Sequence, residues 1–185
     1  MRVLLVRHGE TDWNAAGKIQ GVSDIALNER GRAQAAELAG RLAGEGAERI
    51  YSSPLKRACE TAEILGRALN LPVLAAPELT ELNFGVWEGC SWAEIGERWP
   101  EQFSAYSADR RNYAPPGGES YADMLRRAAP FIGRLRKAPG GAAVCVAHSA
   151  VIRALMADEL GLEVGESYKA IRLPNGVVMA LESLS

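Results

Sequence analysis

The chain has 185 residues, of which 48% are apolar and 24% charged, a composition typical of a soluble globular protein. This length predicts one domain over residues 1–185. The net charge of −2 excludes a global field that would recruit nucleic acid or an acidic membrane surface, so locally placed arginines must attract any anionic ligand.

The first third of the chain alternates short apolar runs with helical patterns. Residues 3–6 predict a buried strand, followed by a polar loop over roughly residues 9–26. Asn28 predicts the N-cap of a helix that ends at the glycines of residues 44–46. The apolar positions of this helix at helical spacing are Ala33, Ala36, Leu38, Ala39 and Leu42.

A second strand is predicted over residues 49–52, and a third, short strand over residues 72–74. Between them, Pro54 begins a predicted helix. Its apolar positions are Cys59, Ala62, Leu65 and Leu69.

Residues 78–116 are less regular and hold three of the four tryptophans, Trp87, Trp92 and Trp99. Helical patches are expected over residues 92–99 and 102–108. We interpret the stretch of about 78–120 as an insertion that caps the sheet edge. Trp92, Trp99 and Phe103 are interpreted as packing residues rather than as a stacking platform.

The last third of the chain begins at the breaker cluster of residues 115–118, after which Glu119 and Ser120 start a predicted long helix to Lys137. A strand around Val144, a helix and a final strand near residues 177–181 follow. The alternation predicts an α/β fold, a three-layer sandwich with a mostly parallel central sheet.

The two histidines of the chain each follow a predicted strand. His8 lies beside Arg7, and His148 precedes a helical segment. Open α/β sheets bind ligands at the carboxyl ends of their strands, so the pair indicates a site for an anion. The alternative is that each is a hydrogen-bonded, partly buried imidazole without a role in catalysis.

Four segments resemble the motifs of the histidine phosphatase superfamily, the phosphoglycerate-mutase-like proteins. In the family's order they are LVRHGETDWN (5–14), SSPLKRACETA (52–62), ELNFGVWEG (81–89) and VAHS (146–149). The resemblance implies a phosphoglycerate-mutase-like fold and a metal-independent phosphatase. Many relatives carry glycines after the second histidine, whereas Ser149 and Ala150 stand there in this chain.

The motifs assign catalytic roles that agree with the chemistry of phosphate esters. Neutral His8 would be the nucleophile and pass through a phosphohistidine intermediate. Arg7 and Arg57 would bind phosphate oxygens with planar forks, and His148, if protonated, would add a third positive group. Glu81 would be the general acid, with its pKa raised by burial or by the adjacent dianion.

The motifs also imply further substrate contacts. By resemblance, Asn14 would contact the phosphate, and Gln20 and Gly21 would line the entrance. Ser149 could donate its backbone N–H from a helix N-terminus. The arginines, Glu81 and His148 also count as substrate-binding residues.

Alternatives remain for two of these side chains. Glu81 could be a solvated loop carboxylate, in which case Glu88 would be the next candidate acid. Arg57 could form an ordinary surface salt bridge, as arginines on helices usually do.

Other phosphoryl chemistries do not fit the spacing. No G-x-x-x-x-G-K-[ST] or G-x-G-x-x-G motif is present. No arginine stands six positions after Cys59, Cys90 or Cys145, as a thiolate phosphatase needs, and these widely spaced cysteines suggest neither disulfides nor a metal pair. Two distant histidines without a carboxylate pair make a poor metal site, so we expect no metal and no cofactor.

The expected function is hydrolysis of a small phosphorylated metabolite, with α-ribazole-5′-phosphate as one candidate. The alternatives are mutase-type phosphoryl transfer and a phosphoester-binding domain without turnover. No apolar run is long enough for a membrane span, and the N-terminus lacks a signal-peptide layout, so we expect a cytoplasmic protein without nucleic-acid or membrane partners. A homodimer is left open.

Overall fold

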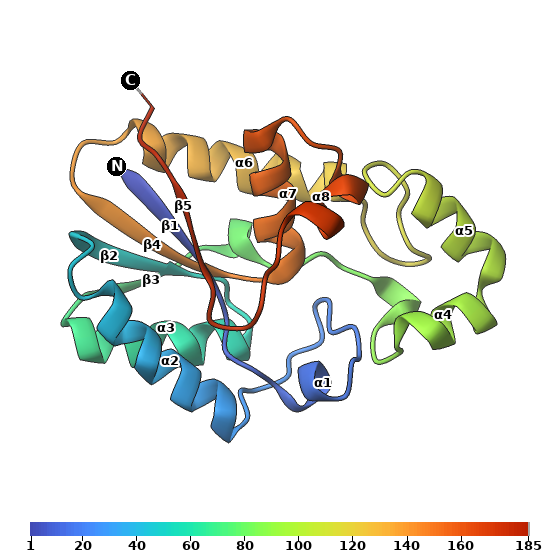
Figure 1. Cartoon of the computed structure of the whole chain (residues 1–185), viewed down its shortest axis with the longest axis horizontal. Coiled ribbons are helices and arrows are strands. Elements are labelled where there is room, and N and C mark those ends of the chain that lie inside the picture. The colour runs from blue at the N-terminus through green and yellow to red at the C-terminus, as the bar shows by residue number, and fades with distance from the viewer. Residues whose placement is uncertain (185) are drawn as a thin grey trace.

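Five strands form one sheet in the spatial order β3-β2-β4-β1-β5 (Figure 1). The computed structural model describes residues 1–184. The strands are β1 (Arg2–Arg7), β2 (Ala47–Ser52), β3 (Val73–Ala75), β4 (Ala142–Ala147) and β5 (Val178–Leu181). β1 and β4, β2 and β4, and β2 and β3 pair in parallel, and β5 pairs antiparallel with β1. The predicted α/β fold with a mostly parallel sheet is confirmed.

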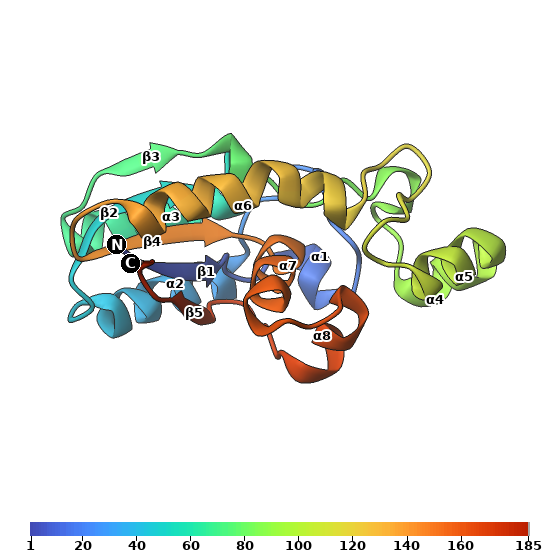
Figure 2. The ribbon, with the colours of Figure 1, turned by 90° about the horizontal axis from the view of Figure 1, so that it is seen from above.

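Helices cover both faces of the sheet (Figure 2). They are α2 (Glu29–Leu42) and α3 (Lys56–Leu69) on one face, and α6 (Tyr121–Lys137) and α7 (Ser149–Leu160) on the other. Successive strand residues point to opposite faces, so Leu4 and Val6 pack with α2 and α3 while Val3 and Leu5 pack with α6 and α7. Each face therefore has its own apolar core.

The register of β1 and β4 brings the two histidines together. Arg7 and Ala147 are the last residues of β1 and β4 and lie opposite each other in the sheet. The residue that follows each strand is a histidine. The backbone N–H of His8 also donates to the carbonyl oxygen of Ala147 at 3.1 Å. Both imidazoles therefore leave the sheet at the same edge, where parallel strands end.

The N-cap predicted for α2 is confirmed, because the side chain of Asn28 accepts from the backbone N–H of Gly31 at 2.8 Å. The predicted apolar face was wrong in part: Ala33 and Ala36 are exposed. The buried positions are Gly31, Ala35, Leu38, Ala39 and Leu42. Alanine is small enough for either face, so the tilt of the helix on the sheet decides which alanines are covered. α3 begins two residues after the predicted Pro54.

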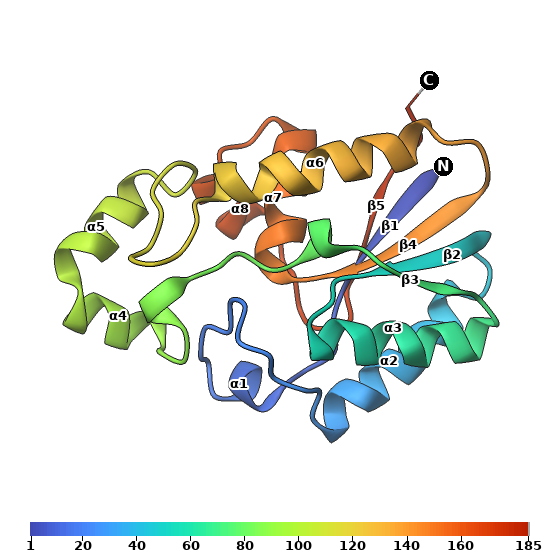
Figure 3. The ribbon, with the colours of Figure 1, turned by 180° about the vertical axis from the view of Figure 1, so that it is seen from behind.

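The segment between β3 and α6 contains the 3-10 turns η1 (Pro77–Leu79) and η2 (Gly85–Trp87) and the helices α4 (Trp92–Arg98) and α5 (Pro100–Ala108). α4 and α5 lie beyond the carboxyl ends of the strands (Figure 2). That residues 78–120 form a capping insertion stays a prediction. Figure 3 shows the chain running from β3 past the start of α7 to α4.

The aromatic residues of this segment pack on one another, as the sequence predicted for Trp92 and Phe103. Buried Trp87 contacts Tyr106 edge to face, with ring centroids 5.3 Å apart, and Trp92 stacks on Tyr106 at 5.7 Å. Trp87 and Trp92 each contact Phe103 as well. This aromatic cluster joins α4 and α5 to η2, which contains Trp87.

Two short helices were not predicted: α1 (Asp12–Ala15), inside the expected polar loop, and α8 (Val164–Ala170), after α7. Each is short and closed by a capping box, with Thr11 and Asn14 at α1 and Glu163 and Glu166 at α8. Each helix contains too few apolar residues for a helical hydrophobic periodicity to be recognised in its sequence. None of the helices in residues 1–184 is long and apolar enough to cross a membrane.

Candidate active site

A cavity of about 170 Å³ opens at the carboxyl ends of the strands, beside the start of α7. All the side chains that the sequence proposed for the site, except His148, line it. They are Arg7, His8, Asn14, Gln20, Gly21, Arg57, Glu81 and Ser149. The fold therefore gathers residues from four distant segments around one cavity.

The hydrogen bond of His8 defines which ring nitrogen carries the proton. Its Nδ1 lies 2.6 Å from the carbonyl oxygen of Gly9. A carbonyl oxygen can only accept, so Nδ1 carries the proton of the neutral ring. Nε2 is then left with a free lone pair.

The surroundings of His8 keep the ring neutral. Burial is the main cause that lowers the pKa of His8 well below its ordinary value, and the positive charges of Arg57 and Arg7 lower it further. The bond to the carbonyl of Gly9 opposes this shift without reversing it. A neutral imidazole with a free Nε2 is the form that can act as a nucleophile.

His148 packs against His8, with ring centroids 5.1 Å apart and planes tilted by 57°. Its Nε2 lies 2.7 Å from the hydroxyl oxygen of Ser53, and its buried Nδ1 has no partner among the described residues. Burial, followed by the charge of Arg57, holds the pKa of His148 well below its ordinary value. The ring is fully buried behind the cavity wall, whereas the sequence placed it in direct contact with substrate.

Arg57 is buried on the first turn of α3, with 1% of its surface exposed. Its guanidinium donates to the carbonyl oxygens of Gly21 at 2.7 Å and Ser23 at 2.8 Å. These acceptors are backbone groups, so the alternative of a surface salt bridge does not describe it. Its buried Nε has no protein partner among residues 1–184 and belongs to a side chain that lines the cavity.

Arg7 is the second guanidinium of the site. One terminal nitrogen donates to the carbonyl oxygen of Leu173, in the loop before β5. Burial lowers the pKa of Arg7 to about 10, and the nearby carboxyl group of Glu81 opposes that shift. At neutral pH the group therefore remains positive, and with Arg57 it makes this end of the cavity cationic.

Two amide side chains present donors to the cavity. The Oδ1 of Asn14 accepts from the backbone N–H of Thr11 at 3.3 Å and from the side chain of Asn175 at 3.0 Å. The Oε1 of Gln20 accepts from the hydroxyl of Thr11 at 2.9 Å. The N–H₂ groups of both side chains have no acceptor among residues 1–184 and can bind an anion.

Asn175 is a site residue that the sequence did not reveal. Its amide nitrogen lies 3.1 Å from the carbonyl oxygen of His8 and 3.2 Å from that of Gly9, the acceptor that fixes the His8 tautomer. It follows Pro174 and precedes Gly176, a combination that indicates only a turn. Its contacts span more than 160 positions of sequence, so no local signal could have identified it.

Glu81 is buried and faces the cavity from the loop after η1. Burial raises the pKa of its carboxyl group, against the opposing effects of the Leu82 backbone N–H and of Arg57. The two oxygens accept from the backbone N–H of Leu82 at 2.9 Å and of Ala150 at 3.3 Å. A solvated loop carboxylate is therefore not what the structure contains.

Glu88, the alternative acid, is not among the cavity-lining residues. Its carboxylate accepts from the backbone N–H groups of Val22, Ser23 and Phe84, and from the hydroxyl of Ser23. These bonds fasten the loop that presents Gly21 to the guanidinium of Arg57. Glu88 therefore stabilises the entrance loop.

The outer wall of the cavity is formed by residues outside the set of catalytic and substrate-binding residues that the motifs implied. They are Lys18, Ile19, Phe84, Trp92, Ala150 and Tyr168. Among residues 1–184 no three His, Cys, Asp or Glu side chains are grouped as metal ligands would be. The cationic side chains that line the cavity are Arg7, Lys18 and Arg57.

Comparison with known proteins agrees with this geometry. The family described as "Histidine phosphatase superfamily (branch 1)" matches residues 3–183. A metal-independent phosphoserine phosphatase of Arabidopsis thaliana is 40% identical, over 83% of this chain and 66% of its own length.

Two solved structures superpose over 98% of this chain and 90% of their own length. A mycobacterial glucosyl-3-phosphoglycerate phosphatase complexed with VO3 has a TM-score of 0.86 at 34% identity. The α-ribazole phosphatase of Shigella flexneri has a TM-score of 0.84 at 30% identity.

Proposed function

The chain belongs to the histidine phosphatase superfamily, and from this premise we propose that it hydrolyses small phosphate monoesters through a phosphohistidine on His8. It is a phosphatase of this superfamily by its relatives. The observation that carries the proposal is the position of His8: Nδ1 is bonded to the carbonyl of Gly9, and the ring lines a cavity that also contains two guanidiniums and a buried carboxyl group.

In the proposed complex the phosphoryl oxygens lie between Arg7 and Arg57. The free amides of Asn14 and Gln20 and the backbone N–H of Ser149, at the first turn of α7, add donors to them. These groups are already held by protein contacts, so little reorganisation is needed when negative charge develops. Preorganised donors of this kind are each worth about 3–4 kcal/mol in the transition state.

In the first step Nε2 of His8 attacks phosphorus, and the bond from phosphorus to the alcohol oxygen breaks. Glu81, protonated because burial raises its pKa, gives its proton to the leaving oxygen. The products of this step are a neutral alcohol, a phosphohistidine and a Glu81 carboxylate.

In the second step the Glu81 carboxylate removes a proton from water, and the resulting hydroxide attacks phosphorus. The bond between phosphorus and Nε2 breaks and releases inorganic phosphate. His8 and protonated Glu81 are both restored. In this step His148, buried against the His8 ring, holds that ring in line with the phosphoryl group.

The outer wall supports a substrate with a small, partly apolar alcohol, because Ile19, Phe84 and Trp92 meet the cavity there together with Lys18. We propose α-ribazole-5′-phosphate as the substrate, since its flat aromatic base would pack on this wall. The relatives are named for phosphoserine, glucosyl-3-phosphoglycerate and α-ribazole phosphate, so these three esters form the panel to compare by kcat/KM.

Trapping the intermediate tests the mechanism. The purified chain is mixed with labelled p-nitrophenyl phosphate, quenched in alkali, and counted for protein-bound, acid-labile label. We expect label on the wild type and none on His8→Ala. Unlabelled wild-type protein that still turns over substrate would refute the phosphohistidine, and absence of both label and turnover would favour the binding domain.

A second measurement separates hydrolysis from mutase-type transfer. With 3-phosphoglycerate, a phosphatase releases inorganic phosphate, whereas a mutase yields 2-phosphoglycerate. We expect phosphate release to dominate.

The cytoplasmic location and the homodimer left open by the sequence stay predictions.

A further inference from the structure

Glu81 lies in a segment, residues 80–84, that belongs to no helix or strand. No ladder of backbone hydrogen bonds therefore fixes the position of its carboxyl group. A general acid must lie within hydrogen-bond reach of the leaving oxygen, so displacement of this backbone would remove its effect. The Ala150 N–H donates to one carboxyl oxygen directly, and contacts from outside the segment must hold the backbone that carries the side chain.

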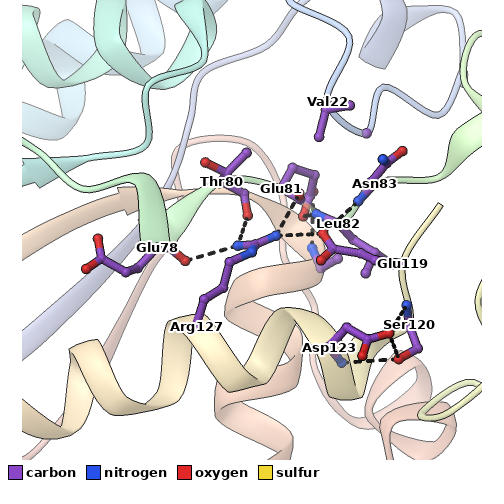
Figure 4. A network of polar contacts seen from close by, with 12 residues as sticks. Val22, Glu78, Thr80, Glu81, Leu82, Asn83, Glu119, Ser120, Asp123 and Arg127 are labelled. Atoms are coloured by element: carbon purple, nitrogen blue, oxygen red, sulfur yellow. Dashed lines mark hydrogen bonds and ion pairs between the residues drawn. The ribbon is translucent and has the colours of Figure 1, made fainter.

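Arg127, on α6, provides such contacts (Figure 4). Its Nη1 donates to the carbonyl oxygens of Glu78 at 3.0 Å and Thr80 at 2.6 Å, and its Nη2 donates to that of Glu81 at 3.1 Å. Among the hydrogen bonds of residues 1–184, the Thr80 and Glu81 carbonyls have no other donor. One guanidinium therefore holds the backbone of residues 78–81.

Glu119 holds the other side. Its Oε1 accepts from Arg127 Nη2 at 2.7 Å and from the backbone N–H of Asn83 at 3.1 Å. Its own backbone N–H donates to the carbonyl of Asn83 at 2.9 Å. Arg127 and Glu119 are each about one-quarter exposed, so the pair is partly shielded from solvent.

Two glycines allow Glu119 to approach. A Cβ on Gly85, whose φ is +56°, would lie 2.1 Å from the carbonyl oxygen of Pro116, and one on Gly118 would lie 2.3 Å from that of Asn83. Only residues without a side chain let these two backbones meet so closely. The turn before α6 is thus docked on the segment that contains Glu81.

We infer that Arg127 and Glu119 are positioning residues that hold the Glu81 carboxyl group in place for proton transfer. The inference rests on the proposed role of Glu81 as general acid. Neither residue lines the cavity, so both act through the backbone around Glu81. Arginine suits this task because its two terminal nitrogens serve four acceptors in fixed directions, which one ammonium group cannot do.

The measurement must separate misplacement of the Glu81 carboxyl group from a general loss of activity caused by a disturbed structure. A general acid contributes about 10²–10⁴-fold when the leaving group is a strong base, and little when the leaving group is stable as an anion. Phenyl phosphates, from p-nitrophenyl to unsubstituted phenyl, differ in how much the leaving oxygen needs a proton, while the substrates remain nearly equal in size. The dependence of kcat/KM on the pKa of the leaving phenol therefore reports whether the acid is in place.

The experiment compares this dependence for the full-length wild type, Arg127→Ala, Arg127→Lys and Glu119→Gln. We expect Arg127→Ala to lose about tenfold or more with phenyl phosphate but under about threefold with p-nitrophenyl phosphate. Arg127→Lys keeps a positive charge at this position, so a steep dependence in this variant isolates geometry from charge. Glu119→Gln should be intermediate.

Two arginines of the same helix provide matched controls. Arg126 is exposed and, within residues 1–184, forms an ion pair only with Asp123. Exposed Arg134 reaches the carboxylate of Glu78 at 3.6 Å, and no hydrogen bond to the Glu78 backbone is found within the same residues. Arg126→Ala and Arg134→Ala should keep the wild-type dependence. Glu81→Gln defines the dependence of an enzyme without the acid.

The outcomes distinguish the inference from the proposed function. A wild-type dependence in Arg127→Ala, alongside a steep one in Glu81→Gln, would overturn the inference alone. A shallow dependence in Glu81→Gln would overturn the role of Glu81 itself. Thermal stabilisation by vanadate shows that each variant is folded, and Arg127→Lys with Glu119→Gln decides the result if Arg127→Ala does not fold.

Discussion

The ring of His148 lies against the ring of His8, 5.1 Å between centroids, although 139 residues separate them in the chain. The parallel pairing of β1 and β4 produces this contact, since each strand ends one residue before its histidine. One ring lines the cavity and the other is buried behind it. Under the proposed mechanism, the pair therefore consists of a nucleophilic imidazole and one that supports it.

The pH dependence of kcat/KM should be set by two shifted groups. As the pH falls, activity is lost only when His8 gains a proton, which happens well below 6.5 because burial and the arginines lower its pKa. As the pH rises, activity falls when Glu81 loses its proton, at a pH above its ordinary pKa. Glu81→Gln should therefore lack the alkaline fall and keep the acidic one. Both proteins are measured with the same substrate, so the ionisation of the substrate affects both profiles equally. An alkaline fall that persists in Glu81→Gln would contradict the assignment of this fall to Glu81.

Arg57→Lys should lower kcat/KM by about 10²–10³-fold, because a lysine cannot bond to Gly21, Ser23 and a phosphoryl oxygen at once. Arg67→Lys, at an exposed position of the same helix, is the control and should change kcat/KM little. Steady-state kinetics with one phosphomonoester checks both. Equal effects of the two substitutions would mean that Arg57 acts only as a bulk charge.

Glu88→Gln should destabilise the fold without removing the acid. Glutamine offers one acceptor oxygen where the carboxylate serves four donors, so the free energy of unfolding should fall by about 1–3 kcal/mol. Urea titration measures this loss, with Glu97→Gln at an exposed position of α4 as control. The alkaline limb of the pH profile should remain, and its disappearance would transfer the acid role to Glu88.

Asn175→Ala should reduce kcat/KM by about ten- to a hundredfold, because it releases the Gly9 carbonyl that orients His8 and the amide oxygen of Asn14. Rapid-quench measurement of the labelled intermediate should show slower formation of the phosphohistidine. Asn112→Ala removes exposed contacts to Asp109 only and should leave the rate unchanged. An unchanged rate in Asn175→Ala would show that the strand alone orients the ring.

Excess chelator should leave kcat/KM unchanged, since Arg7 and Arg57 provide the positive charge that a divalent cation would otherwise supply. The measurement is turnover before and after incubation with EDTA, followed by dialysis. Recovery of a lost activity on addition of magnesium would contradict the proposed mechanism.

The sequence alone identified the local features of this protein. Alternation of apolar and polar segments predicted the mostly parallel sheet, and Asn28 was recognised as an N-cap. Four segments resembled the motifs of one family, and this resemblance implied that they share a site. These features depend on neighbours within a few positions, so they can be read along the chain. Ala33 and Ala36 were misplaced because a small residue is compatible with either side of a helix.

Tertiary structure decided what depends on contacts between distant segments. The tautomer of His8 follows from the Gly9 carbonyl that Asn175 holds, and the backbone around Glu81 is held by Arg127 from another helix. The burial of His148 behind the cavity follows from the pairing of β4 with β1 and β2, which places its ring between His8 and Ser53. Hydrogen-bond direction and burial depend on which distant segments of the chain meet in space. The sequence around Asn175 and Arg127 therefore does not predict their hydrogen-bond partners.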